Sequence, residues 1–228
     1  MGDLYSHEAG TGKDASIATA ERTRAQPAPR RVWYGVTKVG IDLVLAILSL
    51  AALSPVLLIA ALAVRFTSPG PILFRHQRVG RNGVPFVVYK FRTMRTDTGL
   101  TPDAIASFRE NYKLAGDPRI TPVGRWLRRT SLDEAPQLLN VLSGTMSIVG
   151  PRPVTPVELH EKYGEHADEL VSVKPGLTGL WQVSGRSSLT YRQRVDLDLQ
   201  YVRERGLWTD LKIIARTPLA VLLMRGAE

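Results

Sequence analysis

One apolar segment restricts the fold of this chain more than any other feature. Over the 22 residues 43–64, only Ser49, Ser54 and Pro55 are not aliphatic. As a helix rising ~1.5 Å per residue the segment would be about 33 Å long, which is enough to cross the hydrocarbon core of a bilayer. A helix in a soluble core would carry a polar face, and none occurs here. The sequence therefore predicts a membrane helix.

Ser54 and Pro55 interrupt this segment near its middle. Proline removes a backbone donor and clashes with the preceding turn, and serine can bond back to a carbonyl, so a kink is expected. A straight span should be basic mainly at one end, but both ends are basic here. We therefore favour a re-entrant helix over residues 32–66, with a plain transmembrane anchor as the alternative. The flanking basic residues are Arg30, Arg31, Lys38, Arg65, Arg75, Arg78 and Arg81.

The net charge of +9 predicts an anionic partner. Residues 35–100 hold eight basic and two acidic side chains, so much of the excess surrounds the apolar segment. That placement favours an anionic inner leaflet over nucleic acid, which would bind basic residues spread along a groove. The chain has no cysteine and four histidines, which excludes thiol nucleophiles and leaves little material for a histidine metal site or a serine-histidine hydrolase.

The rest of the chain divides into a tail and a catalytic portion. Residues 1–31 lack apolar periodicity and a signal-peptide core, which predicts a flexible tail that stays on the cytoplasmic side. Residues 67–228 predict a mainly helical α+β domain, with a small sheet whose hairpin turns at Asn82 and Gly83. Helices are expected at 103–114, 137–142, 189–205 and 207–224. The last two suit either the membrane interface, as amphipathic helices, or core packing.

The stretch from Arg128 to Pro136, RRTSLDEAP, carries the strongest chemical signal. Because proline is tolerated only in the first turn of a helix, a helix should begin close to Asp133 and Glu134. Its free backbone donors, with the upstream arginines, would stabilise an ionised carboxylate and the phosphate of a ligand. One carboxylate could then attack phosphorus while the other binds Mg²⁺. A capping box from Ser131 to Glu134 is the alternative explanation.

Two further segments offer cations for phosphate binding. Arg152 stands between two prolines, whose restricted backbone could present the guanidinium at little entropic cost, although a plain turn would look the same. Lys90 and Arg92 end an apolar run, where they could bind phosphate or form a solvated edge. Asp198 and Tyr201 share one helix face, as many purely structural pairs do.

Six stretches, taken together and in order, resemble the bacterial sugar transferase family. These monotopic phosphoglycosyl transferases initiate exopolysaccharide, O-antigen and glycoprotein-glycan assembly, and the resemblance, which is to their short form, covers about four-fifths of the chain. The stretches are 68–74 (SPGPILF), 78–83 (RVGRNG), 89–94 (YKFRTM), 130–141 (TSLDEAPQLLNV), 147–153 (SIVGPRP) and 175–186 (PGLTGLWQVSGR). Near Asp198 the usual aromatic pair is replaced by Gln200 and Tyr201.

The resemblance implies a reaction and a location. Asp133 would attack the β-phosphate of a UDP-sugar, UMP would leave, and polyprenyl phosphate (undecaprenyl phosphate) would take the phosphosugar from a covalent aspartate intermediate. The catalytic domain would face the cytoplasm at the bacterial inner membrane, held by a re-entrant helix bent at Ser54 and Pro55. Downstream glycosyltransferases are expected as partners. The competing hypothesis is a membrane-anchored binding module for nucleotide sugars or partner enzymes, without turnover.

The resemblance also implies roles for individual residues. The phosphate ligands would be Arg128, Arg152 and Lys90. Asp133 and Glu134 would form the catalytic pair and share Mg²⁺ with the diphosphate of the donor. The nucleotide pocket would include Gln182 and Arg186.

Overall fold

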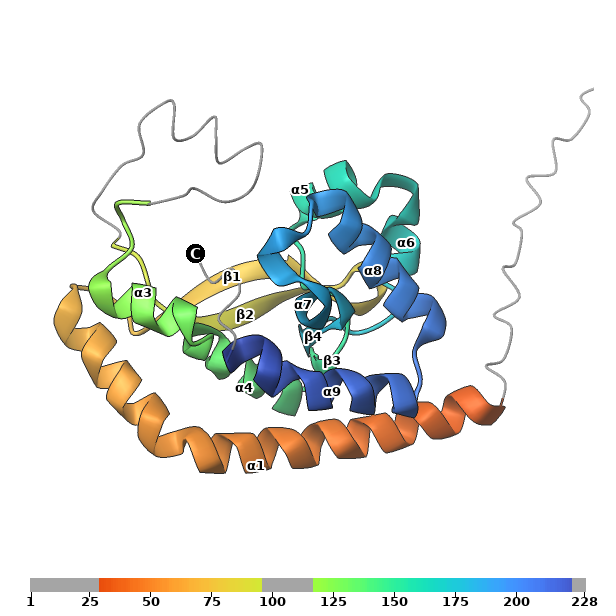
Figure 1. Cartoon of the computed structure of the whole chain (residues 1–228), viewed down its shortest axis with the longest axis horizontal. Helices are drawn as coiled ribbons and strands as arrows, with labels where there is room; N and C mark the ends of the chain where they lie inside the picture. The colour runs from red at the N-terminus through yellow and green to blue at the C-terminus, as the bar shows by residue number, and fades with distance from the viewer. Residues whose placement is uncertain (1–28, 96–116, 223–228) are drawn as a thin grey trace, which may run out of the picture.

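The computed structural model describes residues 29–95 and 117–222. One long helix, α1 (Pro29–Thr67), lies along a smaller α+β body (Figure 1). The body is mainly helical with two small sheets, which confirms the mainly helical α+β part of the predicted fold class. The helix predicted over 103–114 lies outside the described residues. Helix α1 begins three residues before the predicted start of the membrane segment.

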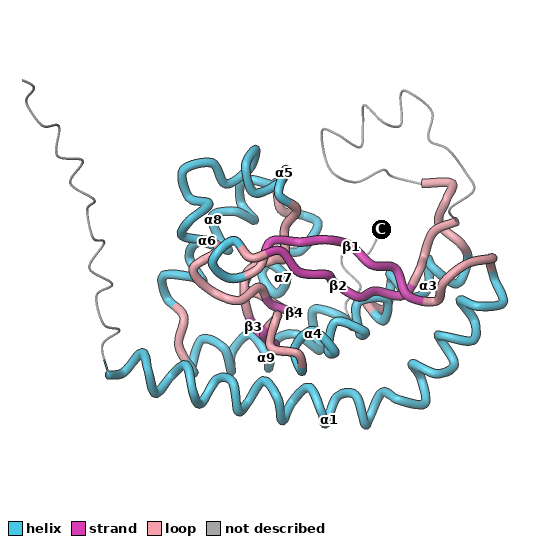
Figure 2. The backbone as a smooth tube through the Cα atoms, turned by 180° about the vertical axis from the view of Figure 1, so that it is seen from behind, coloured by secondary structure: helices cyan, strands magenta, loops and turns pink. Residues whose placement is uncertain are grey.

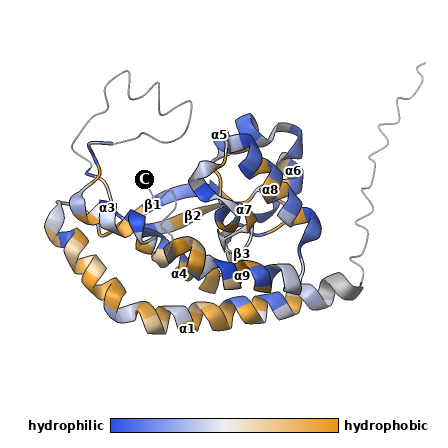
Figure 3. Ribbon diagram, viewed as in Figure 1, coloured by the Kyte–Doolittle hydropathy of each residue, from blue (hydrophilic) through white to orange (hydrophobic). Residues whose placement is uncertain are grey.

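Helix α1 exposes apolar side chains over most of its length (Figure 3). Among the described helices it alone is long and apolar enough to cross a membrane, over Trp33–Thr67, where an 18-residue window has a mean hydropathy of 2.7. Its second half turns away from the direction of its first half (Figure 1). Pro55 lies inside the helix, and the Ser54 hydroxyl donates to the carbonyl of Ala51 at 2.8 Å. The serine therefore makes the back-bond that its position in the sequence suggested.

Polar contacts tie the first half of α1 to the body. Asp42 is buried, accepting from the Ser147 hydroxyl at 2.7 Å and from the Ile148 amide at 3.1 Å. One turn earlier, the Lys38 ammonium lies 2.9 Å from a carboxylate oxygen of Asp210. Because buried charges are costly unless paired, these contacts fix how α1 sits on the body.

The predicted hairpin is present and leads toward the middle of the body. Strands β1 (Leu73–Val79) and β2 (Pro85–Phe91) pair antiparallel around the short helix η1 (Arg81–Gly83). Asn82 and Gly83 both have positive φ angles, of 59° and 76°, which these two residue types adopt more readily than others.

The remaining elements follow in two groups. The first comprises α3 (Pro122–Arg129), η2 (Leu132–Gln137), α4 (Leu138–Leu142) and a parallel pair of strands, β3 (Ser147–Val149) and β4 (Gly176–Thr178). The second is helical and includes α8 (Tyr191–Glu204) and α9 (Leu207–Leu222), near the predicted bounds, with shorter helices before them. These are α5 (Pro156–Glu158), η3 (Leu159–Tyr163), η4 (Gly164–His166), α6 (Ala167–Leu170), α7 (Leu180–Ser184) and η5 (Arg186–Ser188).

Two apolar clusters join α1 to this body. In the first half of α1, Ala46 packs against residues of α4, β3, α8 and α9. In the second half, Ala60 and Val64 pack with Phe91 of β2 and Leu127 of α3. Figure 2 shows α4 and α9 on the side of the body that faces α1, and α5, α6 and α8 on the opposite side.

The structure decides in part between the two roles predicted for α9, which were core packing and a position at the membrane interface. Ile213 of α9 is buried in the core, whereas Trp208 is 69% exposed and Leu219 is 59% exposed. One face of α9 therefore packs in the core and another face is apolar and open.

Candidate active site

The end of β2 meets η2 beside the Asp133–Glu134 pair. The Lys90 ammonium lies 2.5 Å from a carboxylate oxygen of Glu134, although 44 residues separate them. The Glu134 side chain is 29% exposed and Asp133 is buried. The structure thus brings one predicted phosphate ligand directly onto the predicted catalytic pair.

Ser131, which precedes the pair, does not form the alternative capping box. It adopts a left-handed conformation with φ of 58°, and its side chain makes no capping bond. Instead, its hydroxyl accepts from the Arg186 guanidinium at 2.9 Å. The capping-box interpretation is therefore wrong, because the residue that would cap the helix is engaged by an arginine 55 positions away. Arg186 also donates to the carbonyl of Ala220 in α9.

The two carboxyl groups have opposite pKa shifts. Burial, followed by the neighbouring charge of Glu134, raises the pKa of Asp133 to about 6. Burial acts on Glu134 in the same direction, but Lys90, Arg152 and Arg186 outweigh it and hold the pKa of Glu134 below its usual value. Glu134 is therefore the member that stays ionised most readily, and Asp133 is ionised above about pH 6.

Arg128 is held in place from the end of β2. Its Nε donates to the Thr93 hydroxyl at 2.9 Å, while Leu127 beside it packs under α1. Within the described residues the remaining guanidinium nitrogens have no hydrogen-bond partner. Because Asp133 lies close enough to affect its pKa, Arg128 can present donors to an anion beside Asp133.

The loop that carries Arg152 is fixed by backbone packing. Gly150 and Gly176 approach so closely that a side chain on either would collide with backbone atoms of the other. The Arg152 amide donates to Asp198 at 3.3 Å, and the Tyr163 hydroxyl donates to the other oxygen of Asp198 at 2.9 Å. This packing and these bonds hold the loop, whose arginine acts electrostatically on Glu134.

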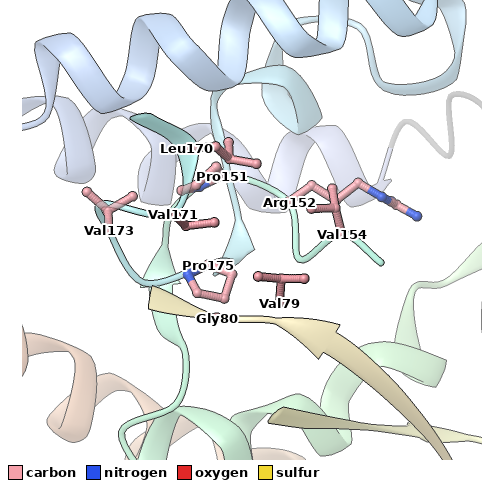
Figure 4. A pocket seen from close by; sticks show the side chains of 9 residues that line it. All are labelled: Val79, Gly80, Pro151, Arg152, Val154, Leu170, Val171, Val173 and Pro175. Carbon is pink, nitrogen blue, oxygen red and sulfur yellow. The ribbon is translucent and has the colours of Figure 1, made fainter. Parts of the chain in front are cut away.

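The side chain of Arg152 extends away from a small pocket behind the loop. Figure 4 shows its guanidinium directed away from the apolar side chains that line that pocket. The lining is otherwise formed by Val79, Gly80, Pro151, Val154, Leu170, Val171, Val173 and Pro175. This pocket is therefore part of the apolar packing that supports the loop, and it offers few polar groups to a ligand.

The structure does not join Gln182 to the other predicted site residues. Its amide nitrogen donates to the carbonyl of Leu177, and its side-chain oxygen is buried without a hydrogen-bond partner among the described residues. Ser54 and Pro55 lie in α1, apart from the catalytic pair. The part of α1 that follows them packs on the body through Ala60 and Val64.

The carboxylates meet only the minimum requirement for a divalent cation. Within the described residues, no group of three or more His, Asp or Glu side chains could hold a metal. Mg²⁺ at phosphoryl-transfer sites commonly uses one or two carboxylates and completes its shell with water and substrate phosphate. Asp133 and Glu134 fit that arrangement, with Lys90 competing for Glu134.

Two supporting residues, Thr93 and Tyr163, were not singled out from the sequence, and Asp198 was considered there only as a partner of Tyr201. Thr93, which holds Arg128, lies in the stretch YKFRTM and could have been singled out there. Asp198 and Tyr163, which hold the Arg152 loop, lie 35 residues apart. Because long-range pairs of this kind leave no local pattern, only the fold reveals them.

Comparisons with known proteins all match this chain to sugar transferases or to proteins of exopolysaccharide production. A family model described as bacterial sugar transferase matches residues 33–224. The exopolysaccharide production protein ExoY of Sinorhizobium fredii is 45% identical over 201 residues, covering 85% of this chain and 88% of that protein. The undecaprenyl-phosphate galactose phosphotransferase of Salmonella typhimurium is also 45% identical, over 82% of this chain but only 40% of its own length. The UDP-glucose:undecaprenyl-phosphate glucose-1-phosphate transferase of Escherichia coli is 45% identical over 77% of this chain and 38% of its own length.

Proposed function

Because this chain belongs to the bacterial sugar transferase family, we propose that it transfers a sugar 1-phosphate from a UDP-sugar to polyprenyl phosphate and releases UMP. The arrangement that carries the proposal is the Asp133–Glu134 pair, which Lys90 contacts and whose ionisation Arg128, Arg152 and Arg186 affect. Relatives named for undecaprenyl-phosphate phosphotransfer support the same reaction class. The product would begin an exopolysaccharide, O-antigen or other glycan chain.

In the first step Asp133 is the nucleophile. One of its carboxylate oxygens attacks the β-phosphorus of the donor, and the bond from that phosphorus to the bridging oxygen breaks. UMP leaves with the bonding electron pair, and the phosphosugar remains on Asp133 as an acyl phosphate. A nucleophile with a pKa of about 6 is largely ionised near neutral pH and more basic than an ordinary aspartate.

In the second step the lipid acceptor regenerates the enzyme. An oxygen of polyprenyl phosphate attacks the same phosphorus, and the bond to the Asp133 oxygen breaks. The carboxylate returns to its ionised form, and the product is a polyprenyl diphosphate sugar. Arg128 and Arg152 would stabilise the charge that develops on the phosphoryl oxygens in both steps.

Mg²⁺ is part of the proposal. When bound, it would neutralise phosphate charge, and Glu134 with Asp133 would hold it together with the diphosphate of the donor. The Lys90 ammonium contacts Oε1 of Glu134, so Oε2 could bind the cation while Lys90 also donates to a phosphate oxygen.

The membrane arrangement completes the proposal. As an ideal helix, the 39 residues of α1 would extend ~58 Å, about twice the hydrocarbon thickness of a bilayer. A re-entrant course bent at Ser54 and Pro55 would let α1 enter and leave by the cytoplasmic face of the inner membrane. The open apolar side chains of α9 would rest on that anionic leaflet, near the downstream glycosyltransferases.

The direct test is UMP release by detergent-purified protein supplied with Mg²⁺, undecaprenyl phosphate and a panel of UDP-sugars. We expect release with at least one sugar and none from Asp133→Asn. Mass spectrometry of protein incubated with donor alone should find the phosphosugar adduct on Asp133. Folded protein that binds UDP-sugars without releasing UMP would instead indicate a non-catalytic binding module.

A further inference from the structure

Two arginines from different elements approach one tryptophan beside the site. Trp181 of α7 is buried, and the guanidinium carbon of Arg152 lies 5.5 Å from the centre of its ring. The guanidinium carbon of Arg194, in the first turn of α8, lies 5.3 Å from the same ring. Each cation is thus within reach of the ring by the usual criterion for a cation–π contact.

Among the residues that the structure describes, Arg194 forms no ion pair with a carboxylate. Its one hydrogen bond among the described residues is from Nη2 to the carbonyl of Leu189 at 3.0 Å, and its Nε is buried without a partner. Asp198, which supports the Arg152 loop, already accepts hydrogen bonds from the Arg152 amide and the Tyr163 hydroxyl.

Arg152 adds a second positive charge beside Arg194. Burial first, and then the charge of Arg152, lower the pKa of Arg194. The Arg152 side chain itself forms no ion pair within the part of the chain that the structure describes, whereas nearby Arg78 is paired with Glu158 at 2.8 Å. Arg152 acts on Glu134, Glu158 and Asp198 from a distance, but no salt bridge among the described residues includes Arg152 or Arg194. Two half-buried guanidinium groups beside one ring, without a direct ion pair, are an arrangement that a bound anion would stabilise.

The position of Arg194 indicates which anion would bind there. Arg152 acts on Glu134 from one side and shares Trp181 with Arg194 on the other, so the cations continue from the catalytic pair toward α8. Helix α8 begins on the side of the body opposite α1 in both views (Figures 1 and 2), and only its C-terminal end reaches the cluster around Ala46. A lipid acceptor arrives from α1, whereas a water-soluble donor can extend toward α8.

We propose that Arg194 binds the α-phosphate of the nucleotide-sugar donor, the phosphate that leaves within the nucleoside monophosphate. The inference rests on the proposed function, in which Arg128 and Arg152 bind the β-phosphate at Asp133. Trp181 would hold Arg194 in place through its ring. Arg194 is then a donor-binding residue that takes no part in recognising the polyprenyl phosphate.

Binding experiments on the full chain separate this role from a structural one. In the Asp133→Asn protein in detergent, Arg194→Gln should weaken UMP binding by about tenfold or more, as expected for loss of a charged hydrogen bond. Binding of uridine, which lacks the phosphate, should stay the same. Arg192→Gln, an exposed arginine in the same turn, is the matched control and should bind UMP normally.

Kinetics in the active protein give a second readout. Arg194→Gln should raise the KM for the donor and leave the KM for polyprenyl phosphate within about twofold. Arg194→Lys keeps the charge over Trp181 and should recover part of the UMP affinity. Unchanged UMP affinity in Arg194→Gln, or an equal loss for UMP and uridine, would overturn the inference alone. Absence of UMP binding by the Asp133→Asn reference would overturn the proposed donor as well.

Discussion

A Cβ atom built on Gly124 would lie 2.1 Å from the carbonyl oxygen of Thr93. Helix α3 and the chain that follows β2 therefore touch backbone to backbone at this point. One turn along α3, Arg128 bonds the side chain of the same threonine. The missing side chain at position 124 thus sets how close Arg128 comes to the end of β2, and through it to Asp133.

Gly124→Ala should push α3 away from Thr93. Since the atoms in the way belong to the backbone, we expect a loss of about 2 kcal/mol in the free energy of unfolding, as overpacking typically costs. We also expect UMP release to fall, because Arg128 moves with the helix. Gly206→Ala is the control, since no atom lies within 4 Å of its Cβ position. Thermal unfolding in detergent checks this, and equal melting temperatures for the two variants would contradict the argument.

Asp133→Asn should abolish UMP release and yet stabilise the fold at neutral pH. The pKa of Asp133 is about 6 in the folded protein, against about 3.9 in an unfolded chain. The folded state therefore binds this proton more tightly, and stability falls as pH rises from about 4 to 6. Above pH 6 the ionised group destabilises the fold, so its removal should add on the order of 1 kcal/mol.

Unfolding of the Asp133→Asn variant at two pH values checks the sign. The gain in stability should be present at pH 7.5 and should shrink toward pH 4, where the wild-type group is protonated in both states. Asp196→Asn, at an exposed position, should show little change at either pH. A variant less stable than the wild type at pH 7.5 would mean that the carboxylate is stabilised, as the helix-start argument from sequence had expected.

Local features were predictable from the sequence, and long-range partners were not. Asn82 and Gly83 indicated the hairpin because those two residue types favour the positive φ angles found there. The role of Ser131 was predicted wrongly, because its partner is far away in the sequence. Its spacing to Glu134 fits a capping box, but its actual partner, Arg186, comes from a distant segment. Likewise, the apolar run predicted α1, but no local pattern could place Asp42 against Ser147.

Lys90→Met should shift the acid limb of the pH profile of UMP release to higher pH. The Lys90 ammonium helps to lower the pKa of Glu134 and opposes the rise in the pKa of Asp133. Without it both carboxyl groups hold their protons at higher pH, so activity should be lost more strongly at pH 6 than at pH 8. Lys90→Arg keeps the charge and should keep the limb. UMP release measured from pH 5 to 8 decides this, and a uniform loss with an unmoved limb would show that Lys90 acts in another way.

Asp198→Asn should weaken donor binding by loosening the Arg152 loop. Burial raises the pKa of Asp198 to about 7, so the wild-type group is ionised at pH 8 and mostly protonated at pH 6. A neutral amide resembles the protonated acid, so the substitution should raise the donor KM by about fivefold at pH 8 and less at pH 6. Tyr163→Phe, which removes the other bond to Asp198, should act in the same direction. Steady-state kinetics at both pH values measure this, and an effect independent of pH would argue against it.

Replacing both Ser54 and Pro55 by Leu should convert a re-entrant α1 into a spanning helix. The change restores the backbone donor that proline lacks and removes the Ser54 bond to Ala51. Because the chain has no cysteine, single cysteines can report topology through an impermeant maleimide on intact cells. Ser16→Cys should be protected in the native chain and labelled in the double-Leu chain. Glu165→Cys, with a side chain 89% exposed, should stay protected in both. Labelling of Ser16→Cys in the otherwise native chain would show that α1 already spans the membrane, and the bend at Pro55 would then serve packing rather than re-entry.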